Sequence, residues 1–325
     1  MPPFVETTLG RLPKEKLGRI NAHEHLFVDS SQGIVKDPDF KLDNVEFAIR
    51  DTTEWRDAGG GAMVDTMPVS AGRNVGKLIK VSAATGVPIV VPTGFHKGYY
   101  YWPDHWRYRY DEDEIVELIA AEIEQGCDLN EYQGPIIKRC TVKAGAMKVA
   151  GLYNFIEENM KQLIRAVGRV HQRNGCPVFV HTERGLECFE LVQRLADAGV
   201  PPRCVVICHM DRNADLWLHR KLAATGVFLE YDTPSRFKYQ PESVVVKLMR
   251  DMIDAGYLDR LMLGGDMARR SYLKSYGGGP GYAYLLTHFT PRLRDEGFSE
   301  PELDAIWRDN PFRWLTSGQT QSSSF

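Results

Sequence analysis

The sequence predicts a (β/α)8 barrel (TIM barrel) of the α/β class, in a single domain. Short apolar, β-rich runs alternate with longer segments of helical periodicity, and this alternation repeats eight times along 325 residues. Alternating strands and helices predict a parallel sheet, and eight such units in about 300 residues fit a closed barrel. The alternative is an open doubly wound sheet, but no GxGxxG motif follows the first strand.

The eight predicted strands each end in a polar or aromatic residue. In chain order they end near His23, Asp65, Thr93, Lys148, His181, His209, Tyr231 and Asp266. Amphipathic stretches separate most of them, and the clearest covers 154–174. Its apolar residues at helical spacing are Phe155, Ile156, Met160, Leu163, Ile164, Val167 and Val170. We assign 1–325 to this one domain and expect the polar segment 315–325 to be a frayed tail.

Composition and charge exclude several classes of protein. Forty basic and 43 acidic residues give a net charge of −3 without a basic stripe, so nucleic acid is not an expected partner. The longest apolar runs are too short to span a bilayer, and the N-terminal residues lack the apolar stretch of a signal peptide. Six scattered cysteines without a CxxC pair are typical of reduced thiols. We therefore expect a cytoplasmic protein with no membrane partner.

The segment after the third predicted strand, Phe95 to Tyr110, is unusually aromatic. It holds eight aromatic side chains and several bases within sixteen residues. One interpretation is a capping loop whose rings cover the barrel mouth, and the other is a substrate lid or an oligomer contact. Loops at this end of a barrel often serve both purposes, so the sequence leaves the role of 95–110 open.

Candidate metal ligands stand at the ends of five predicted strands. His23 and His25 are two positions apart on one strand, so both imidazoles point to the same side and can reach one ion. Four other strands end in Lys148, His181, His209 and Asp266. The carboxyl ends of barrel strands converge on the catalytic face. Each histidine alone is more simply interpreted as a buried, hydrogen-bonded imidazole, but their coincidence with an aspartate favours a metal site.

Lys148 needs a separate argument, because an ammonium group is a poor metal ligand. Between two divalent ions its pKa would fall, and the neutral amine could add CO2. The resulting carbamate is an anion with two oxygens, and it could bridge both ions as a carboxylate does. Lys143 is the competitor, but five positions upstream it faces the other side of the strand, farther from the C-terminal mouth. We assign the bridge to Lys148 and regard Lys143 as solvated or salt-bridged.

Taken together, these motifs resemble the phosphotriesterase-related branch of the amidohydrolase superfamily. The resemblance is carried by HEH (23–25), VKAGAMKVA (142–150), VHTERG (180–185), ICHMDRN (207–213) and LGGDMARR (263–270). It runs in order from TTLGRL (7–12) to NPFRWL (310–315), which is nearly the whole chain. It implies a barrel with two divalent metal ions per chain, a carboxylated lysine and a homodimeric assembly.

Carried over position by position, the resemblance implies a role for each ligand. The inner metal would be held by His23, His25 and Asp266, the outer metal by His181 and His209, and Lys148 with a hydroxide would bridge them. Zinc is the first expectation, although manganese, cobalt or iron suit the same ligands. Two cations lower the pKa of a shared water, and Asp266 can pass its proton to the leaving oxygen. Lys148 is followed by Val-Ala-Gly, where family members often have Gly-Thr or Ala-Thr, so local substrate contacts differ.

The residues after the last two predicted strands favour an anionic substrate. Arg269, Arg270, Tyr272 and Lys274 follow the eighth strand, where barrels often bind phosphate. The glycine-rich stretch 277–281 precedes a helical segment, so free backbone N–H groups could add to an anion site. A solvated basic loop is the simpler interpretation of any one of these residues. Together with Lys238 after the seventh strand, they favour an anion.

HMDRN, FKY, DMARRSYLKSYGGGPGY and NPFRWL are also similar to the sugar-phosphate lactonases of this family. By that similarity Lys238, Arg269 and Tyr272 would grip the phosphate, with Arg212 as a weaker candidate. The segment 235–239 departs from other members, and the aromatic residues of 95–110 leave room for a bulkier substrate. The first hypothesis is a metal-dependent lactonase acting on a phosphorylated or otherwise anionic sugar lactone.

Three alternatives stay open at this point. One is a hydrolase of another ester, amide or phosphotriester whose bulkier substrate contacts aromatic side chains. Another is a metal-bound binding module without turnover, which would be expected to lack a ligand or the proton acceptor. The third is a purely structural barrel. All six expected positions are filled, which weighs against the last two.

Overall fold

Eight parallel strands form the barrel that the sequence predicts. They are β3 (Asn21–Glu24), β4 (Met63–Asp65), β5 (Ile89–Gly94), β6 (Ala144–Ala150), β7 (Val178–His181), β8 (Val205–Ile207), β9 (Phe228–Tyr231) and β10 (Leu261–Leu263). The computed structural model describes residues 2–319, and in it each strand pairs with the next in chain order from β3 to β10. The ring closes just beyond β10, where the N–H groups of Gly265 and Asp266 both donate to His23 O at 2.9 Å. The predicted (β/α)8 barrel is therefore confirmed.

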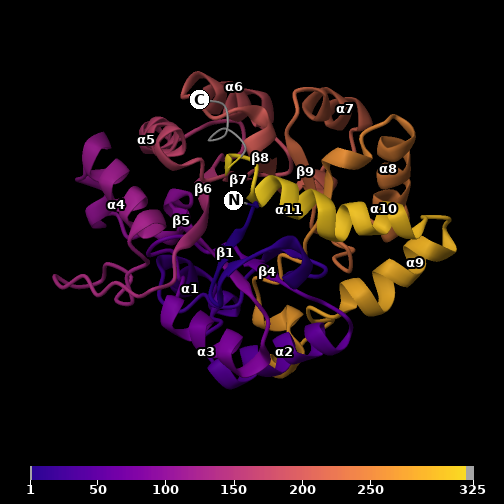
Figure 1. Ribbon diagram of the computed structural model, residues 1–325, viewed down its shortest axis with the longest axis horizontal. Coiled ribbons are helices and arrows are strands. Elements are labelled where there is room, and N and C mark those ends of the chain that lie inside the picture. Colours follow the sequence, from indigo (N-terminus) through magenta and orange to yellow (C-terminus); the bar gives the residue numbers. More distant parts are fainter. Residues whose placement is uncertain (1, 320–325) are drawn as a thin grey trace.

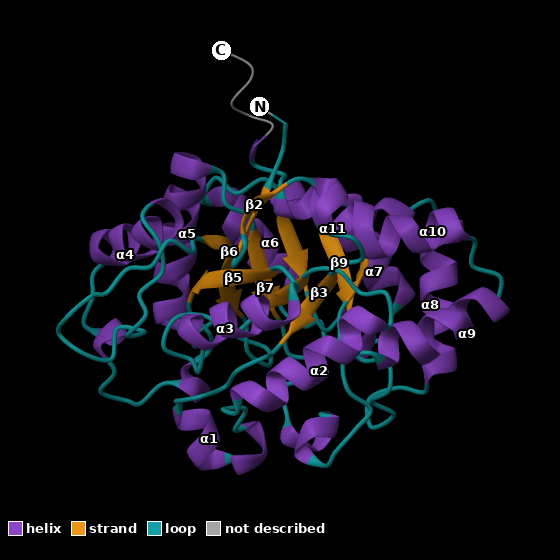
Figure 2. Ribbon diagram, turned by 60° about the horizontal axis from the view of Figure 1, so that its bottom comes forward, coloured by secondary structure: helices purple, strands orange, loops and turns teal. Residues whose placement is uncertain are grey.

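Helices surround the strands as an outer ring (Figure 1). The larger ones are α2 (Val45–Asp57), α3 (Val75–Thr85), α4 (Glu112–Glu124), α5 (Glu158–Asn174), α6 (Cys188–Asp197), α7 (Leu216–Ala224) and α8 (Glu242–Asp254). The short ones are α1 (Gln32–Lys36), α9 (Thr290–Asp295), α10 (Glu300–Asp304) and α11 (Asn310–Leu315). An antiparallel hairpin of β1 (Val5–Thr7) and β2 (Gly10–Leu12) precedes the barrel. Figure 2 shows β2 toward one end of the molecule and α1 at the other.

Local sequence accounts for several of the helix ends. The side chain of Asn74 caps α3 by accepting from the N–H of Lys77, and Asp111 begins α4 with a capping box. Gly86 and Gly175 end α3 and α5 in the left-handed conformation, which glycine adopts without a steric cost. The two polar side chains thus fix where α3 and α4 begin, and the two glycines fix where α3 and α5 end and the chain turns back toward the sheet.

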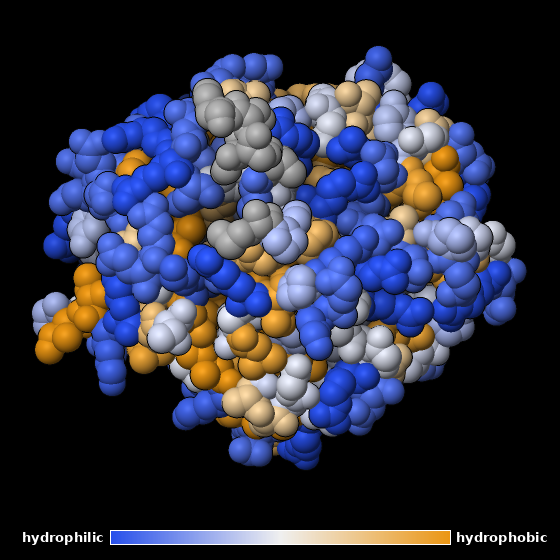
Figure 3. All heavy atoms as spheres, viewed as in Figure 1, coloured by the Kyte–Doolittle hydropathy of each residue, from blue (hydrophilic) through white to orange (hydrophobic). Residues whose placement is uncertain are grey.

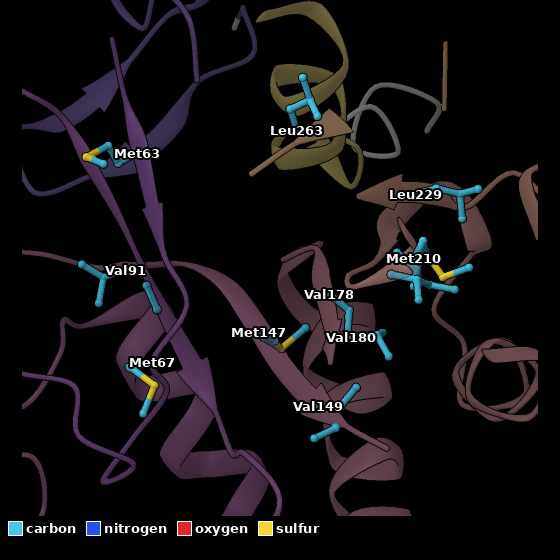
Figure 4. Packing of buried hydrophobic residues seen from close by; sticks show 14 of the residues in the cluster. Met63, Met67, Val91, Met147, Val149, Val178, Val180, Met210, Leu229 and Leu263 are labelled. Atoms are coloured by element: carbon cyan, nitrogen blue, oxygen red, sulfur yellow. The ribbon is translucent and has the colours of Figure 1, made fainter. Parts of the chain in front are cut away.

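The strands separate two apolar cores. Alternate strand residues point into the barrel, where Val64, Val90, Phe179 and Phe228 belong to a buried cluster that includes Trp314 of α11. The residues between them point outward to the helices. Figure 4 shows this outer layer, which includes Met63, Val91, Met147, Val149, Val178, Val180, Leu229 and Leu263. Because both faces of each strand are buried, the strand sequences are nearly continuous runs of apolar residues. A polar residue at the end of such a run is therefore easy to recognise in the sequence.

Two predicted boundaries are wrong. The helix expected over 154–174 begins at Glu158, because Asn154 adopts a positive φ of 61° and Leu152 bridges to Phe155, so the chain turns there first. Phe155 is accordingly 53% exposed rather than a core residue. The expected frayed tail starts too early, since Leu315 is buried and Gln319 exchanges hydrogen bonds with the backbone of Phe4. Residues 320–325 of that tail lie outside the described residues.

A projecting loop carries exposed apolar side chains. Figure 3 shows a mostly hydrophilic face with apolar atoms at its left edge, where the loop between α4 and β6 projects. Ile136 and Ile137 of this loop are 72% and 54% exposed. Among residues 2–319, no helix is both long and apolar enough to cross a membrane. In the same range all six cysteines are free thiols.

Candidate active site

Three candidate metal ligands, from the first and the last strand of the barrel, meet at the carboxyl ends of the strands. His23 lies on β3, His25 directly follows this strand, and Asp266 lies three residues beyond β10. His23 Nε2 is 3.3 Å from His25 Nε2. Asp266 Oδ1 is 3.4 Å from the former nitrogen and 3.1 Å from the latter. The structure therefore brings the three residues expected at the inner metal into one buried group.

His181 and His209 form a second group beside the first. His181 ends β7, and His209 lies two residues beyond β8 in a left-handed conformation with φ 64°. His181 Nδ1 is 2.9 Å from His209 Nε2, and the rings of His209 and His23 have their centroids 5.2 Å apart. The two residues expected at the outer metal therefore lie together, next to the inner group.

Lys148 lies on β6 at the floor of this site and is only 1% exposed. Its Nζ donates to Thr66 O at 2.7 Å and lies 5.3 Å from the centre of the Phe179 ring. Burial lowers the pKa of this amine to about 8, because desolvation disfavours the charged form. Lys143 lies just before β6, where it lines a cavity with Phe4. The two lysines therefore lie at opposite ends of the barrel.

Three of the four imidazoles have their other nitrogen on a carboxylate. The pairs are His23 Nδ1 with Glu230 Oε2 at 2.9 Å, His209 Nδ1 with Asp232 Oδ2 at 2.7 Å, and His181 Nε2 with Glu183 Oε1 at 3.1 Å. A neutral imidazole that donates from one nitrogen has a lone pair on the other. Burial lowers the pKa of His181 and His209, so both are neutral and their nitrogens turned toward the site are acceptors, whereas Glu230 and Asp266 outweigh burial and raise the pKa of His23. This carboxylate–histidine arrangement is typical of metal ligands.

The chemistry of these groups fits divalent metal ions. His181 Nδ1 and His209 Nε2 lie 2.9 Å apart, and because the other nitrogen of each ring faces a carboxylate, both can turn a lone pair toward a cation. His25 Nδ1 is buried without a hydrogen-bond partner among the described residues. Nitrogen and carboxylate ligands suit zinc, manganese, cobalt and iron. Cys208 lies with His23, His209 and Asp232 in a second candidate group, whose ligand atoms are within 4.8 Å of one another; burial raises the pKa of its thiol to about 11.

Two arginines hold Asp266 from the side opposite the histidines. Arg236 donates to Asp266 O and, at 3.0 Å, to Asp266 Oδ2. Arg212 also donates to Asp266 Oδ2, and both arginines reach Asp232 Oδ1. Burial alone would raise the pKa of Asp266, but Arg236 and His23 beside it hold that pKa well below its usual range. The carboxylate is therefore ionised, with Oδ1 left to face the imidazoles.

The sequence prediction did not include Arg236, Asp232 or Glu230. All three are buried, with exposed fractions of 5%, 0% and 0%. Glu230 lies in β9 and Asp232 directly follows it, within the otherwise apolar run FLEYD. A charged residue at a position that the strand must bury is the signal by which the sequence could have revealed them. Arg236 lacks even that signal, because only the fold shows that the turn after β9 is buried.

A cavity of about 180 Å³ opens above the two groups. It is lined by His25, His181, His209 and Asp266, by the aromatic rings of Phe40, Tyr100, Tyr239 and Tyr272, and by the cations of Lys97, Arg212, Arg236 and Arg269. The acids among the lining residues are Glu183 and Asp266. Each of the four cations also has a carboxylate partner, so an anionic ligand would share these cations with the carboxylates.

The three residues expected to bind substrate lie near this cavity in different ways. Tyr272 and Arg269 line it. Lys238 is exposed, and its Nζ lies 2.6 Å from the Tyr272 hydroxyl at the rim. Arg269 donates to Asp37 Oδ2 at 2.6 Å, and its guanidinium packs on the ring of Phe40. Lys238 and Tyr272 are therefore paired, whereas Arg269 already has an anionic partner.

The glycine-rich stretch 277–281 does not supply the free N–H groups that the sequence suggested. Gly278 donates to Leu273 O, Gly279 to Ser271 O and Gly281 to Tyr272 O. Its backbone donors are thus used to fold the loop on itself. Lys274, which was grouped with these residues, pairs with Glu54 on α2. This part of the expected anion site is wrong.

The aromatic segment 95–110 covers one side of the cavity. Tyr100 lines the cavity and is 9% exposed, and His96 and Lys97 line it beside Tyr100. Other rings of the segment face outward, since Trp102 is 47% and Tyr108 38% exposed. One end of the segment therefore touches the site and the other end touches solvent.

Comparisons with known proteins agree with this geometry. Residues 3–315 match the model of the phosphotriesterase family. A phospho-furanose lactonase from Mycoplasmopsis synoviae is 33% identical over 96% of this chain and 91% of its own length. The phosphotriesterase homology protein of Escherichia coli is 31% identical over 90% of this chain and 96% of its own. The crystal structure of a lactonase from Listeria monocytogenes superposes with a TM-score of 0.89 at 31% identity, covering 96% of this chain and 99% of the other.

Proposed function

The chain belongs to the phosphotriesterase family and is a hydrolase, and from that premise we propose that it opens the ring of a phosphorylated sugar lactone. One observation carries this proposal. The ligand groups at the floor of the cavity and an excess of cations around it occupy the same small space. A hydrolytic centre beneath a cavity lined by four basic side chains suits an anionic ester. The phospho-furanose lactonases among the relatives are named for such a substrate.

Two divalent ions are part of the proposal. His23, His25 and Asp266 would hold the inner ion, His181 and His209 the outer one, and a carboxylated Lys148 would contact both. Such ions, when bound, polarise the carbonyl of the lactone and lower the pKa of a water molecule. Zinc is the first candidate, with manganese, cobalt and iron as alternatives.

The proton transfer is assigned to Asp266. Its Oδ1 faces His23 and His25, where the attacking water would lose its proton. Its Oδ2 is held by Arg212 and Arg236, which fix the carboxylate plane. Asp266 would accept the proton and return it to the ring oxygen as the ester bond breaks, so no net proton is taken up in the step.

The phosphate would be bound at the rim, about Lys238 and Tyr272. Their 2.6 Å contact supports a paired ammonium and hydroxyl donor. Arg269 would join them by exchanging Asp37 for the phosphate, which makes its contribution the smaller one. In this assignment the residues at the floor of the cavity carry out the hydrolysis, and the residues at its rim bind the phosphate.

A second candidate is the hydrolysis of another ester, an amide or a phosphotriester with a bulkier substrate. The observation in its favour is the aromatic lining, since Phe40, Tyr100 and Tyr239 all reach the cavity. The same rings can cover the apolar face of a sugar ring, so they do not require a larger substrate.

A paired assay tests the proposal. Enzyme loaded with Zn²⁺ or Mn²⁺ in the presence of bicarbonate is given pentono-lactone 5-phosphates and the same lactones without phosphate, and acid release is followed with a pH indicator. We expect a strong preference for the phosphorylated lactones. Equal rates would keep the lactonase and discard the phosphate site. No hydrolysis of either, with two ions bound, would favour the second candidate.

Cytoplasmic location and a homodimeric state remain part of the proposal. They rest on the free cysteines and on the family resemblance. Light scattering of the purified chain would test the dimer, and a monomer at working concentration would contradict it.

A further inference from the structure

His181 is held at both nitrogens and on its ring face. Nδ1 faces His209 Nε2 at 2.9 Å, and Nε2 faces Glu183 Oε1 at 3.1 Å. The ring of His96 packs edge-on against it with the centroids 4.6 Å apart. A neutral imidazole has one N–H. An acceptor at Nε2 keeps that hydrogen there and leaves the lone pair at Nδ1, the atom that faces the ligand groups.

Glu183 is itself held by Lys97. Lys97 follows β5 and Glu183 follows β7, so the pair joins two loops across the cavity that both residues line. The carboxylates that hold His23 and His209 have fully buried side chains on or next to β9. Glu183 is 28% exposed and Lys97 is 18% exposed. The support of His181 therefore depends on a loop rather than on a strand.

The aromatic segment 95–110 fixes the position of Lys97. The N–H of Lys97 donates to His96 Nδ1 at 2.8 Å, and Arg107 donates to His96 O at 2.8 Å. Arg107 is buried among rings of the same segment, with Tyr101 at 3.9 Å and Tyr108 at 4.5 Å from its guanidinium carbon. Such cation–π contacts hold a guanidinium in a partly apolar site. They make the segment a fixed frame around Lys97.

We propose that Glu183, held by Lys97, is a positioning residue that presents Nδ1 of His181 to the outer metal, and that the aromatic segment is built to hold this pair. The inference rests on the metal centre of the proposed function and deepens it. It gives segment 95–110 a role besides covering the cavity. The relevant contact is Lys97–Glu183–His181, which connects that segment to the metal ligands.

The test is metal binding by the metal-free protein, without substrate. Zn²⁺ is titrated by calorimetry and Co²⁺ by its visible absorption, in the wild type and in Glu183→Ala, Glu183→Gln and Lys97→Met. Outer carboxylate partners of metal-bound histidines are worth about 10- to 100-fold in metal affinity. We expect Glu183→Ala to weaken one of the two ions by that factor and to leave the other unchanged. Glu183→Gln keeps an acceptor oxygen, so its loss should stay within a few-fold.

Glu158→Ala is the matched control. Glu158 is exposed and pairs with Lys161 on α5, away from segment 95–110 and from His181. Its metal affinities should equal those of the wild type. Lys97→Met should give part of the loss, and its combination with Glu183→Ala should be less than additive, because both break one link. Melting curves of the metal-free variants show that each one folds.

Three results would overturn the inference. They are wild-type binding of both ions by Glu183→Ala, equal losses in Glu158→Ala and Glu183→Ala, and a loss in Glu183→Gln as large as in Glu183→Ala. The metal titration uses no lactone, so its result does not depend on which substrate the enzyme hydrolyses. A failure to hydrolyse lactones in the separate assay would therefore refute the proposed substrate and leave this inference standing. A wild-type protein that takes up fewer than two ions would refute the metal centre and this inference together.

Discussion

Replacing Arg73 by methionine should cost a large part of the stability of the protein. Arg73 follows β4, and its side chain is fully buried. It donates to both oxygens of Glu122 on α4 at 2.8 Å, to both oxygens of Glu131 at 2.9 and 3.2 Å, and to Pro92 O on β5 at 2.6 Å. One cation thus ties α4 and the loop around Glu131 to the strand that leads to Lys97.

The expected magnitude follows from the burial of its partners. The side chains of Glu122 and Glu131 are 0% and 5% exposed, so the substitution leaves two carboxylates out of water without a cation. Breaking a buried ion pair from one side costs about 3–5 kcal/mol. Native domains are stable by about 5–15 kcal/mol, and about 4 kcal/mol lowers the melting temperature of a large domain by roughly 10 °C.

The loss should depend on pH. Burial raises the pKa of Glu131 from an ordinary 4.5 to about 7, against the opposing effect of Arg73. A raised carboxyl pKa means that this residue favours the folded state below pH 4.5 and that the advantage is lost as the pH rises through about 7. Without Arg73 the pKa of Glu131 rises further. The deficit of Arg73→Met should therefore be larger at pH 8 than at pH 5.

Urea unfolding at pH 8 and pH 5 measures this effect. Arg11→Met is the control, because Arg11 makes an exposed ion pair with Glu6 and its loss should cost less than about 1 kcal/mol. Adding Glu122→Gln and Glu131→Gln to Arg73→Met should restore much of the stability, since no buried charge then remains unpaired. A cost below 1 kcal/mol for Arg73→Met, or no gain in the triple variant, would refute the reasoning.

Three further predictions concern the site and the outer helices. Asp266→Asn should lower kcat for lactone opening by at least about 10²-fold, through loss of the proton acceptor, in a variant that still folds but melts at a lower temperature because Arg212 and Arg236 lose a charged partner; a kcat within tenfold of the wild type would contradict the role of Asp266. Lys238→Ala should raise KM for a phosphorylated lactone about tenfold, and Arg269→Ala should raise it less, because Arg269 already pairs with Asp37; equal changes with an unphosphorylated lactone would remove both residues from the phosphate site. Asp51 is 2% exposed on α2, and burial raises its pKa from 3.8 to about 6, so ionised Asp51 opposes folding by up to about 3 kcal/mol above pH 6; Asp51→Asn should be more stable than the wild type at pH 8 but not at pH 4, and denaturation curves showing the same difference at both pH values would refute this.

Much of the fold and of the ligand set could be predicted from the sequence. Strands buried on both faces must be apolar, so a histidine, lysine or aspartate at the end of such a run is conspicuous without a structure. His23, His181 and Asp266 were found in this way, and the barrel topology brings their strand ends to one face. The prediction of an N-terminal helix boundary at 154 failed because a single left-handed residue, Asn154, interrupts the helix where the apolar pattern continues.

Only the tertiary structure decided which groups support and restrain that ligand set. Arg236 follows β9 and Arg212 follows β8, yet both donate to Asp266 beyond β10. Arg269 is held by Asp37, which is 232 residues away in the sequence. The sequence determined the candidate ligands because burial and strand geometry act locally, within a few residues. It left open the partners of each charge, because Coulomb forces and hydrogen bonds act between neighbours in space, and distant segments become neighbours only when the barrel closes.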